Sequence, residues 1–114
     1  MSFDSERRRH PRYPLRLAIK LHYGRELLDA DIINASASGV LILCATPLEP
    51  GGVVEASIPE LMIPRTTLHI LRCHAVPMGY MVAAYFEAVI SDEAPFARLA
   101  EEQGASLAHL RWLN

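Results

Sequence analysis

Hydrophobic and polar residues alternate along the first third of the chain. From Leu15 to Tyr23 every second residue is apolar, and most of the residues between them are charged or polar. A period of two places the two sets of side chains on opposite faces of an extended segment. The pattern therefore predicts a half-buried β-strand over residues 15–23.

Further strands are predicted from apolar runs that are separated by turn residues. Glycine and proline divide the runs, as at Gly24, at Pro47–Gly52 and at Pro77–Gly79. The connections are too short to hold crossover helices, so neighbouring strands are expected to be antiparallel and to form a barrel or a sandwich. The further predicted strands cover residues 27–35, 39–44, 53–58, 66–76 and 81–88.

The last part of the chain changes to a helical pattern. Ser91, Asp92 and Glu93 are typical of a helix start, and we expect a helix over about residues 92–103. Its packing face would consist of Phe96, Leu99 and Ala100, and Gly104 is expected to end it. Residues 105–114 would add a last turn or a short helix.

The chain begins with an arginine-rich stretch that cannot continue as a helix. Pro11 and Pro14 each remove an amide donor and push the preceding residue out of the helical region. We therefore divide the chain into a flexible arm (1–14), a β-barrel (15–90) and a helical segment (91–114). With 114 residues, these parts are expected to form a single domain.

Composition narrows the class of protein. Apolar residues make up 51% and charged residues 21% of the chain, a balance typical of a folded globular protein. No segment has the length and apolar character of a membrane span, and the start does not resemble a secretion signal, so a cytoplasmic location without membrane insertion is expected. Cys44 and Cys73 are then expected to be reduced and buried.

The net charge of −2 hides a strong asymmetry. Residues 1–20 hold six basic and two acidic side chains, whereas the remaining residues hold five basic and eleven acidic ones. A compact positive region on an acidic body favours a small polyanion over the long phosphate array of duplex DNA. The charge pattern therefore predicts a nucleotide ligand and no nucleic-acid partner.

Two short motifs indicate which residues would bind the predicted nucleotide. Arg8 and Arg12 form the pattern R-x-x-x-R, and residues 34–39 (Asn-Ala-Ser-Ala-Ser-Gly) follow about two dozen positions later. Guanidinium groups suit phosphate oxygens and the O6/N7 edge of guanine. A polar turn that ends in glycine lets the backbone come close to a ligand.

In this order and at this spacing, the motifs resemble the two signatures of the PilZ family, R-x-x-x-R and [D/N]-x-S-x-x-G. The resemblance is strong over residues 6–58 and extends to the later strands in outline. It implies a six-stranded antiparallel β-barrel with a C-terminal α-helix, and a receptor for the bacterial messenger cyclic di-GMP, over which the arginine arm would close.

The resemblance also assigns roles to the motif residues. The arginines would hold phosphates and guanine bases, Asn34 and Ser36 would bond base edges and phosphate, and Gly39 would shape the turn. The register of the arginine run is ambiguous by one residue. The candidate ligand-binding residues are Arg7, Arg8, Arg9, Arg12, Asn34, Ser36 and Gly39.

Other functions are disfavoured by the residues present. The histidines lack metal-ligand spacing, and Ser36 and Ser38 lack a nucleophile elbow, so we expect neither a metal, a cofactor nor enzymatic activity. An RNA- or single-strand-binding barrel would need exposed aromatic residues among basic ones, but aromatic residues make up 7% of the chain. The remaining alternative is a protein-interaction module of the same fold that does not bind nucleotide. Under either PilZ reading we expect a downstream protein partner.

Overall fold

The structure of the protein is a computed structural model that describes residues 10–113, with side chains up to Gly104. The candidate ligand-binding residues Arg7, Arg8 and Arg9 lie outside the described residues.

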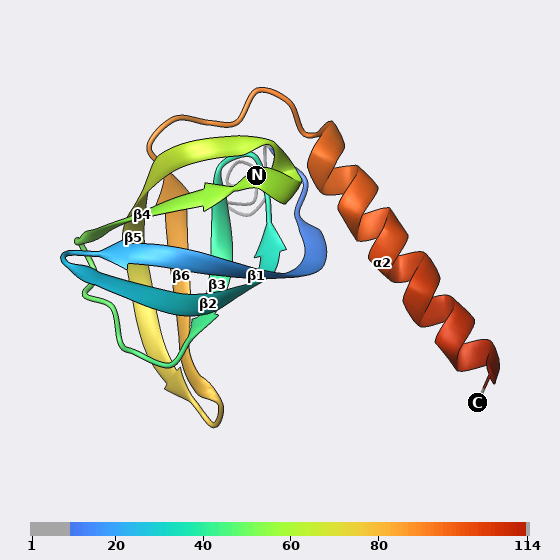
Figure 1. Cartoon of the computed structure of the whole chain (residues 1–114), viewed down its shortest axis with the longest axis horizontal. Coiled ribbons are helices and arrows are strands. Elements are labelled where there is room, and N and C mark those ends of the chain that lie inside the picture. The colour runs from blue at the N-terminus through green and yellow to red at the C-terminus, as the bar shows by residue number, and fades with distance from the viewer. Residues whose placement is uncertain (1–9, 114) are drawn as a thin grey trace, which may run out of the picture.

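Six strands form a closed barrel, with the long helix at one side (Figure 1). The strand order around the barrel is β1-β2-β3-β6-β5-β4, and all neighbouring pairs are antiparallel. The predicted fold class is thus confirmed, and the alternative of an open sandwich is excluded. The strands are β1 (Tyr13–Tyr23), β2 (Glu26–Ala35), β3 (Gly39–Cys44), β4 (Val53–Ile58), β5 (Ile63–Val76) and β6 (Gly79–Phe86).

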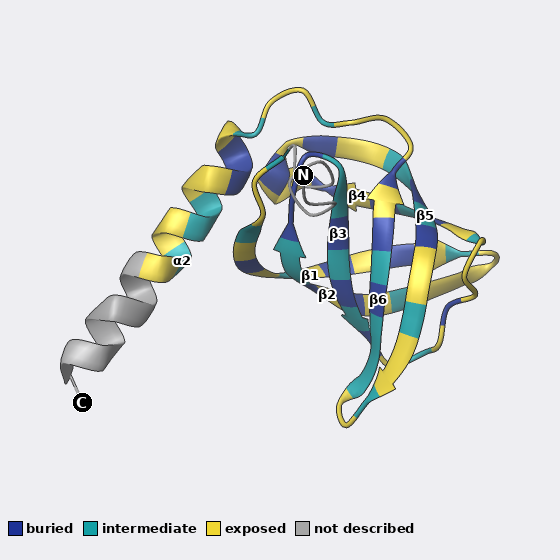
Figure 2. Ribbon diagram, turned by 180° about the vertical axis from the view of Figure 1, so that it is seen from behind, coloured by how far each residue is buried: buried dark blue, intermediate teal, exposed yellow. Residues whose placement is uncertain are grey.

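The alternation read from the sequence sets which side chains fill the barrel. Figure 2 shows buried and more exposed residues alternating along the strands. In β1, Leu15, Ile19 and Leu21 are buried, while the intervening charged residues face outward. Removing such side chains from water supplies the main force that closes the sheet. The largest fully buried residues are Phe96, Leu21, Ile32, Ile42, Ile58, Leu61, Leu68, Val54 and Val82.

The start of β5 differs most among the strand boundaries from the prediction, and it includes a proline. The fifth strand was predicted over residues 66–76, but β5 already begins at Ile63, after the 3₁₀ turn η1 (Pro59–Leu61), and so includes Pro64. The register of β4 and β5 shifts between Ala56 and Ile58, where Pro64 lies on the opposing strand. The proline is tolerated because a bulge leaves its position without the ladder hydrogen bond that it cannot donate.

The helix α2 (Ala94–Leu113) is longer than the sequence suggested. Asp92 accepts a hydrogen bond from the Ala94 N–H at 3.0 Å, so the predicted start is close to the observed one. The prediction that Gly104 ends the helix is wrong. A single glycine costs only about 1 kcal/mol relative to alanine in a helix, and the helix-forming residues on both sides outweigh it. No helix in the described part of the chain has the length and apolar character needed to cross a membrane.

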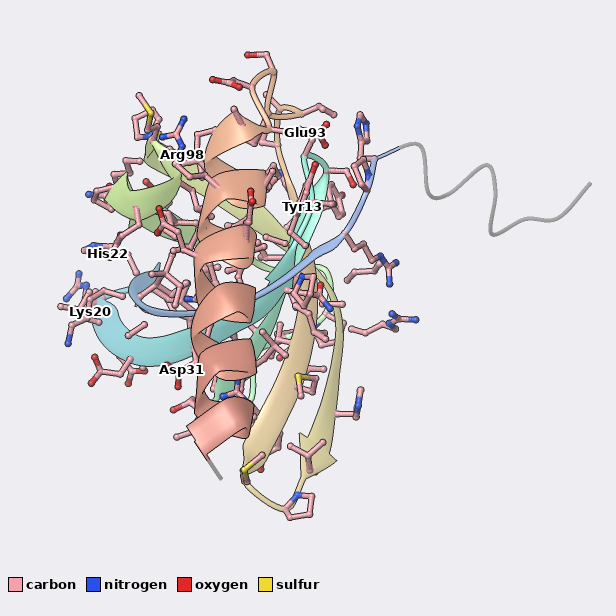
Figure 3. All side chains as sticks on the ribbon, turned by 90° about the vertical axis from the view of Figure 1, so that its right-hand side faces the viewer. Tyr13, Lys20, His22, Asp31, Glu93 and Arg98 are labelled. Carbon is pink, nitrogen blue, oxygen red and sulfur yellow. The ribbon has the colours of Figure 1, made fainter. Side chains whose placement is uncertain are left out.

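Two contacts fix α2 beside β1, where Figure 3 shows the helix in front of the strand. Phe96 is fully buried in the first turn, and its ring meets Tyr13 edge-on with centroids 6.1 Å apart. Further along, the Gln103 side chain accepts a hydrogen bond from the Arg16 N–H and donates one to the Arg16 carbonyl oxygen, both at 2.7 Å. Arg16 lies where the β1–β2 register shifts, so the helix completes the hydrogen bonding of an irregular strand segment.

Replacing Gln103 with alanine should release the second half of α2 from β1. Both hydrogen bonds to Arg16 are lost, and each contributes about 0.5–1.5 kcal/mol. Amide hydrogen exchange should accelerate in α2 while the barrel strands keep their protection. The exposed neighbour Glu102→Ala is the matched control, and equal exchange rates in the two variants would contradict the anchoring role of Gln103.

Candidate functional site

The polar loop between β2 and β3 is built around one serine side chain. Ser36 is only 7% exposed, and its hydroxyl oxygen accepts hydrogen bonds from the backbone N–H groups of Ser38 (3.2 Å) and Gly39 (3.3 Å). The Ser36 N–H donates to the Gly39 carbonyl oxygen at 2.8 Å, and its hydroxyl lies 3.0 Å from that of Ser38. Short side-chain bonds to nearby backbone stabilise a tight turn. The loop is therefore ordered by its own residues.

The same loop is bound to the end of β6 and to the segment that follows it. The carbonyl oxygen of Ser38 accepts from the Phe86 N–H at 2.9 Å, and that of Ala37 accepts from the Ile90 N–H at 2.8 Å. Gly39 is needed for this approach, because a Cβ atom at this position would lie 2.4 Å from the Ala84 carbonyl oxygen. The structure shows that this glycine makes room for the neighbouring strand, and its close approach to a ligand stays a prediction.

Strand pairing gathers distant residues on the outer face of the barrel. One cross-strand row runs from Pro14 through Asn34, Leu41 and Ala83 to Arg72. Directly paired residues share a face of a sheet, so the start of β1 and the middle of β5 contribute to the same surface. Figure 2 shows β3, β6 and β5 side by side on this face.

A second row lies two residues along on the same face. Tyr85 in β6 pairs with Gly39 of β3 on one side and with His69 of β5 on the other. Gly39 and Ala83 are small, whereas Tyr85 and Arg72 are long. Small residues surrounded by long ones leave a depression in the surface.

That depression is a cavity of about 250 Å³. Two arginines, Arg12 and Arg72, contribute to its wall, and no aspartate or glutamate does so among the described residues. The cavity is therefore positive on a chain whose net charge is −2. Its polar and charged lining residues are His10, Arg12, Asn34, Ser36, Ser38, Arg72 and Tyr85.

The cavity brings Arg12 of the first sequence motif together with the second motif. Arg12, Asn34, Ser36 and Gly39 all line it, although Arg12 is more than twenty positions away from the others in the chain. The Ser36 hydroxyl is used within its own loop, so it holds the cavity wall in shape. The described residues contain no group of three or more His, Cys, Asp or Glu side chains placed to hold a metal ion.

Sequence reasoning did not find Arg72 and Tyr85. Both reach the cavity through strand pairing, and the β5–β6 register shifts between Ile70 and Arg72, which a period-two pattern does not reveal. One signal was available, since Arg72 is the only lysine or arginine between Arg65 and Arg98. A solitary cation in an otherwise uncharged strand segment is a candidate for a specific contact.

Comparison with known proteins identifies the family of the chain. The family model of the PilZ domain matches residues 6–93, and the chain therefore belongs to the PilZ domain family. No curated protein sequence is similar enough to this chain to count as a relative.

Two solved structures share the fold. The PilZ domain of YcgR from Escherichia coli, solved with c-di-GMP, has a TM-score of 0.60 and 13% identity, and the match covers 90% of this chain and 98% of that one. The Bacillus subtilis inhibitor of motility (MotI/DgrA) has a TM-score of 0.60 and 15% identity, over 90% of this chain. The chain spans about half of the Bacillus protein, of which the match covers 52%.

Proposed function

We propose that this protein is a receptor for cyclic di-GMP, which it binds between the arginine-rich N-terminal segment and the outer face of the barrel. The observation that carries the proposal is that Arg12 and the Asn34–Gly39 loop line the same positive cavity. Membership of the PilZ domain family and the likeness to a PilZ domain solved with c-di-GMP support it.

The cavity suits part of a cyclic dinucleotide. Ligand sites commonly enclose about 300–1,000 Å³. At about 250 Å³ this cavity would hold one nucleotide unit, while the rest of the ligand extends past its rim. Arg12 would bind phosphate or a guanine edge, and Asn34 would bond a base edge. Arg7, Arg8 and Arg9 would add contacts from the segment before His10.

Arg12→Ala should weaken cyclic di-GMP binding by about 10- to 150-fold, because a hydrogen bond to a charged group contributes about 1.5–3 kcal/mol. Isothermal titration calorimetry with cyclic di-GMP measures this loss. Titrations with GMP and with a short RNA test the ligand class, and we expect no comparable heat from either. Arg25→Ala is the matched control, since it removes an exposed arginine from the β1–β2 turn.

If Arg12→Ala binds as tightly as the parent, the role of Arg12 is wrong. If the parent binds the RNA more tightly than cyclic di-GMP, the receptor function is wrong. If it binds neither, the protein is a PilZ-fold interaction module.

The proposed receptor acts by changing shape and not by catalysis. Arg12 precedes Tyr13, whose ring contacts Phe96 of α2, and Gln103 of α2 is bonded to Arg16. A ligand bound at Arg12 would therefore also affect the helix and present a changed surface to a downstream protein partner. The likeness to an inhibitor of motility is in keeping with such an effector role. Such a receptor would work in the bacterial cytoplasm.

A further inference from the structure

One aromatic side chain in the cavity wall is held in an unusual way. Tyr85 is 48% exposed, and its ring is stacked on the imidazole of His69, with centroids 5.0 Å apart and planes inclined by 13°. His69 is itself oriented by Glu87, whose carboxylate lies 3.3 Å from its Nε2 atom. An exposed tyrosine would otherwise sample several rotamers, so this support fixes the plane of its ring.

On the side of Tyr85 away from His69, the paired residue in β3 has no side chain to cover the ring. Its partner in β3 is Gly39, which has no side chain, whereas its partner in β5 is His69. One face of the ring is therefore covered by an imidazole, and the other borders the cavity that also contains Arg12 and Asn34. The backbone of β6 does not permit a larger residue at position 39, so this side stays open.

We propose that Tyr85 is a stacking platform for a purine base, with His69 as the residue that positions it. This inference rests on the proposed cyclic di-GMP function and names a specificity-determining residue outside both sequence motifs. A flat ring with one supported face and one free face offers what a nucleobase stacks on. Arg72 lines the same cavity, and a guanidinium group suits the edge of a guanine base.

Tyr85→Leu should weaken cyclic di-GMP binding by about 5- to 150-fold, the range found when stacking on an aromatic residue is lost. Tyr85→Phe should bind within about twofold of the parent, because the ring and not the hydroxyl makes the contact. Binding is measured by calorimetry on the full chain. Tyr80→Leu, on the same strand but lining a different cavity, is the matched control.

A second measurement detects stacking directly. In the complex with the parent, the H8 proton of one guanine should shift upfield in the NMR spectrum because it lies over the Tyr85 ring. The shift should persist in Tyr85→Phe and disappear in Tyr85→Leu. Cyclic di-UMP, whose bases are smaller, should bind less tightly than cyclic di-GMP, and the preference should shrink in Tyr85→Leu.

The positioning role of His69 has its own test. His69→Ala should weaken binding and reduce the H8 shift, and His69→Phe should restore both because a ring again supports Tyr85. If His69→Phe fails to rescue, the support does not act through stacking and the role of His69 is overturned.

The experiments distinguish failure of the stacking platform from failure of the receptor function. If Tyr85→Leu matches the parent in affinity and in H8 shift while Arg12→Ala binds at least about 10-fold more weakly, the platform is wrong and the receptor function stands. If the parent itself does not bind cyclic di-GMP, both are overturned.

Discussion

Replacing Gly39 with alanine is expected to lower the free energy of unfolding by roughly 2–4 kcal/mol. The added Cβ atom would meet the Ala84 carbonyl oxygen at 2.4 Å and the Tyr85 Cα atom at 3.1 Å. Both are backbone atoms of β6, so no side chain can rotate to make room. The strands must separate locally, and the bond from Phe86 N–H to the Ser38 carbonyl oxygen would lengthen or break. Urea denaturation of the two proteins measures the difference.

Gly104→Ala provides a control with the same chemical change. Nothing lies within 4 Å of a Cβ atom at Gly104, which is an interior residue of α2. Alanine should stabilise the helix there by about 0.5–1 kcal/mol. We therefore expect Gly39→Ala to lower the free energy of unfolding and Gly104→Ala to raise it. If Gly39→Ala is as stable as the parent, the close approach of β6 to this loop is not present in solution.

Phe96→Ala is the second substitution with a large expected effect. The Phe96 side chain is fully buried, and truncating a buried phenylalanine typically costs about 3–5 kcal/mol. The change also removes the edge-on contact with Tyr13, which adjoins Arg12. Thermal unfolding should shift down by roughly 10 °C or more.

Amide exchange shows where that stability is lost. We expect α2 to exchange faster than the barrel strands in Phe96→Ala, because the ring attaches the first helical turn to β1. Phe96→Leu, which keeps most of the apolar volume, should retain much of the stability. Unchanged exchange in α2 would mean that the helix is held by contacts other than Phe96.

The sequence predicted the strands because most of them have one buried face. In β1 the alternation of Leu15, Ile19 and Leu21 with charged residues is a local signal that needs no knowledge of the partner strands. The antiparallel arrangement followed from the short turns, as at Gly24, which has a φ of 61°. Helix length was less predictable, since a glycine such as Gly104 ends a helix in one context and is tolerated in another.

The sequence predicted only those parts of the candidate site that belong to short sequence motifs. Arg12 and the Asn34–Gly39 loop form recognisable motifs, and the structure brings them to one cavity. Arg72 and Tyr85 belong to no motif, because their place depends on the register of β3, β5 and β6 and on a bulge. Register is a property of paired strands, so the sequence of one strand does not contain it.

The pairing of β1 with β4 is short, and this affects the expected solubility of a truncated chain. It covers Leu21 and His22, while the earlier part of β1 lies beside α2 and uses Gln103 to occupy the N–H and carbonyl groups of Arg16. The helix thus shields a strand edge that could otherwise recruit a strand from another molecule. A chain cut before Ala94 would carry that edge uncovered, and its tendency would be to aggregate even with an intact barrel.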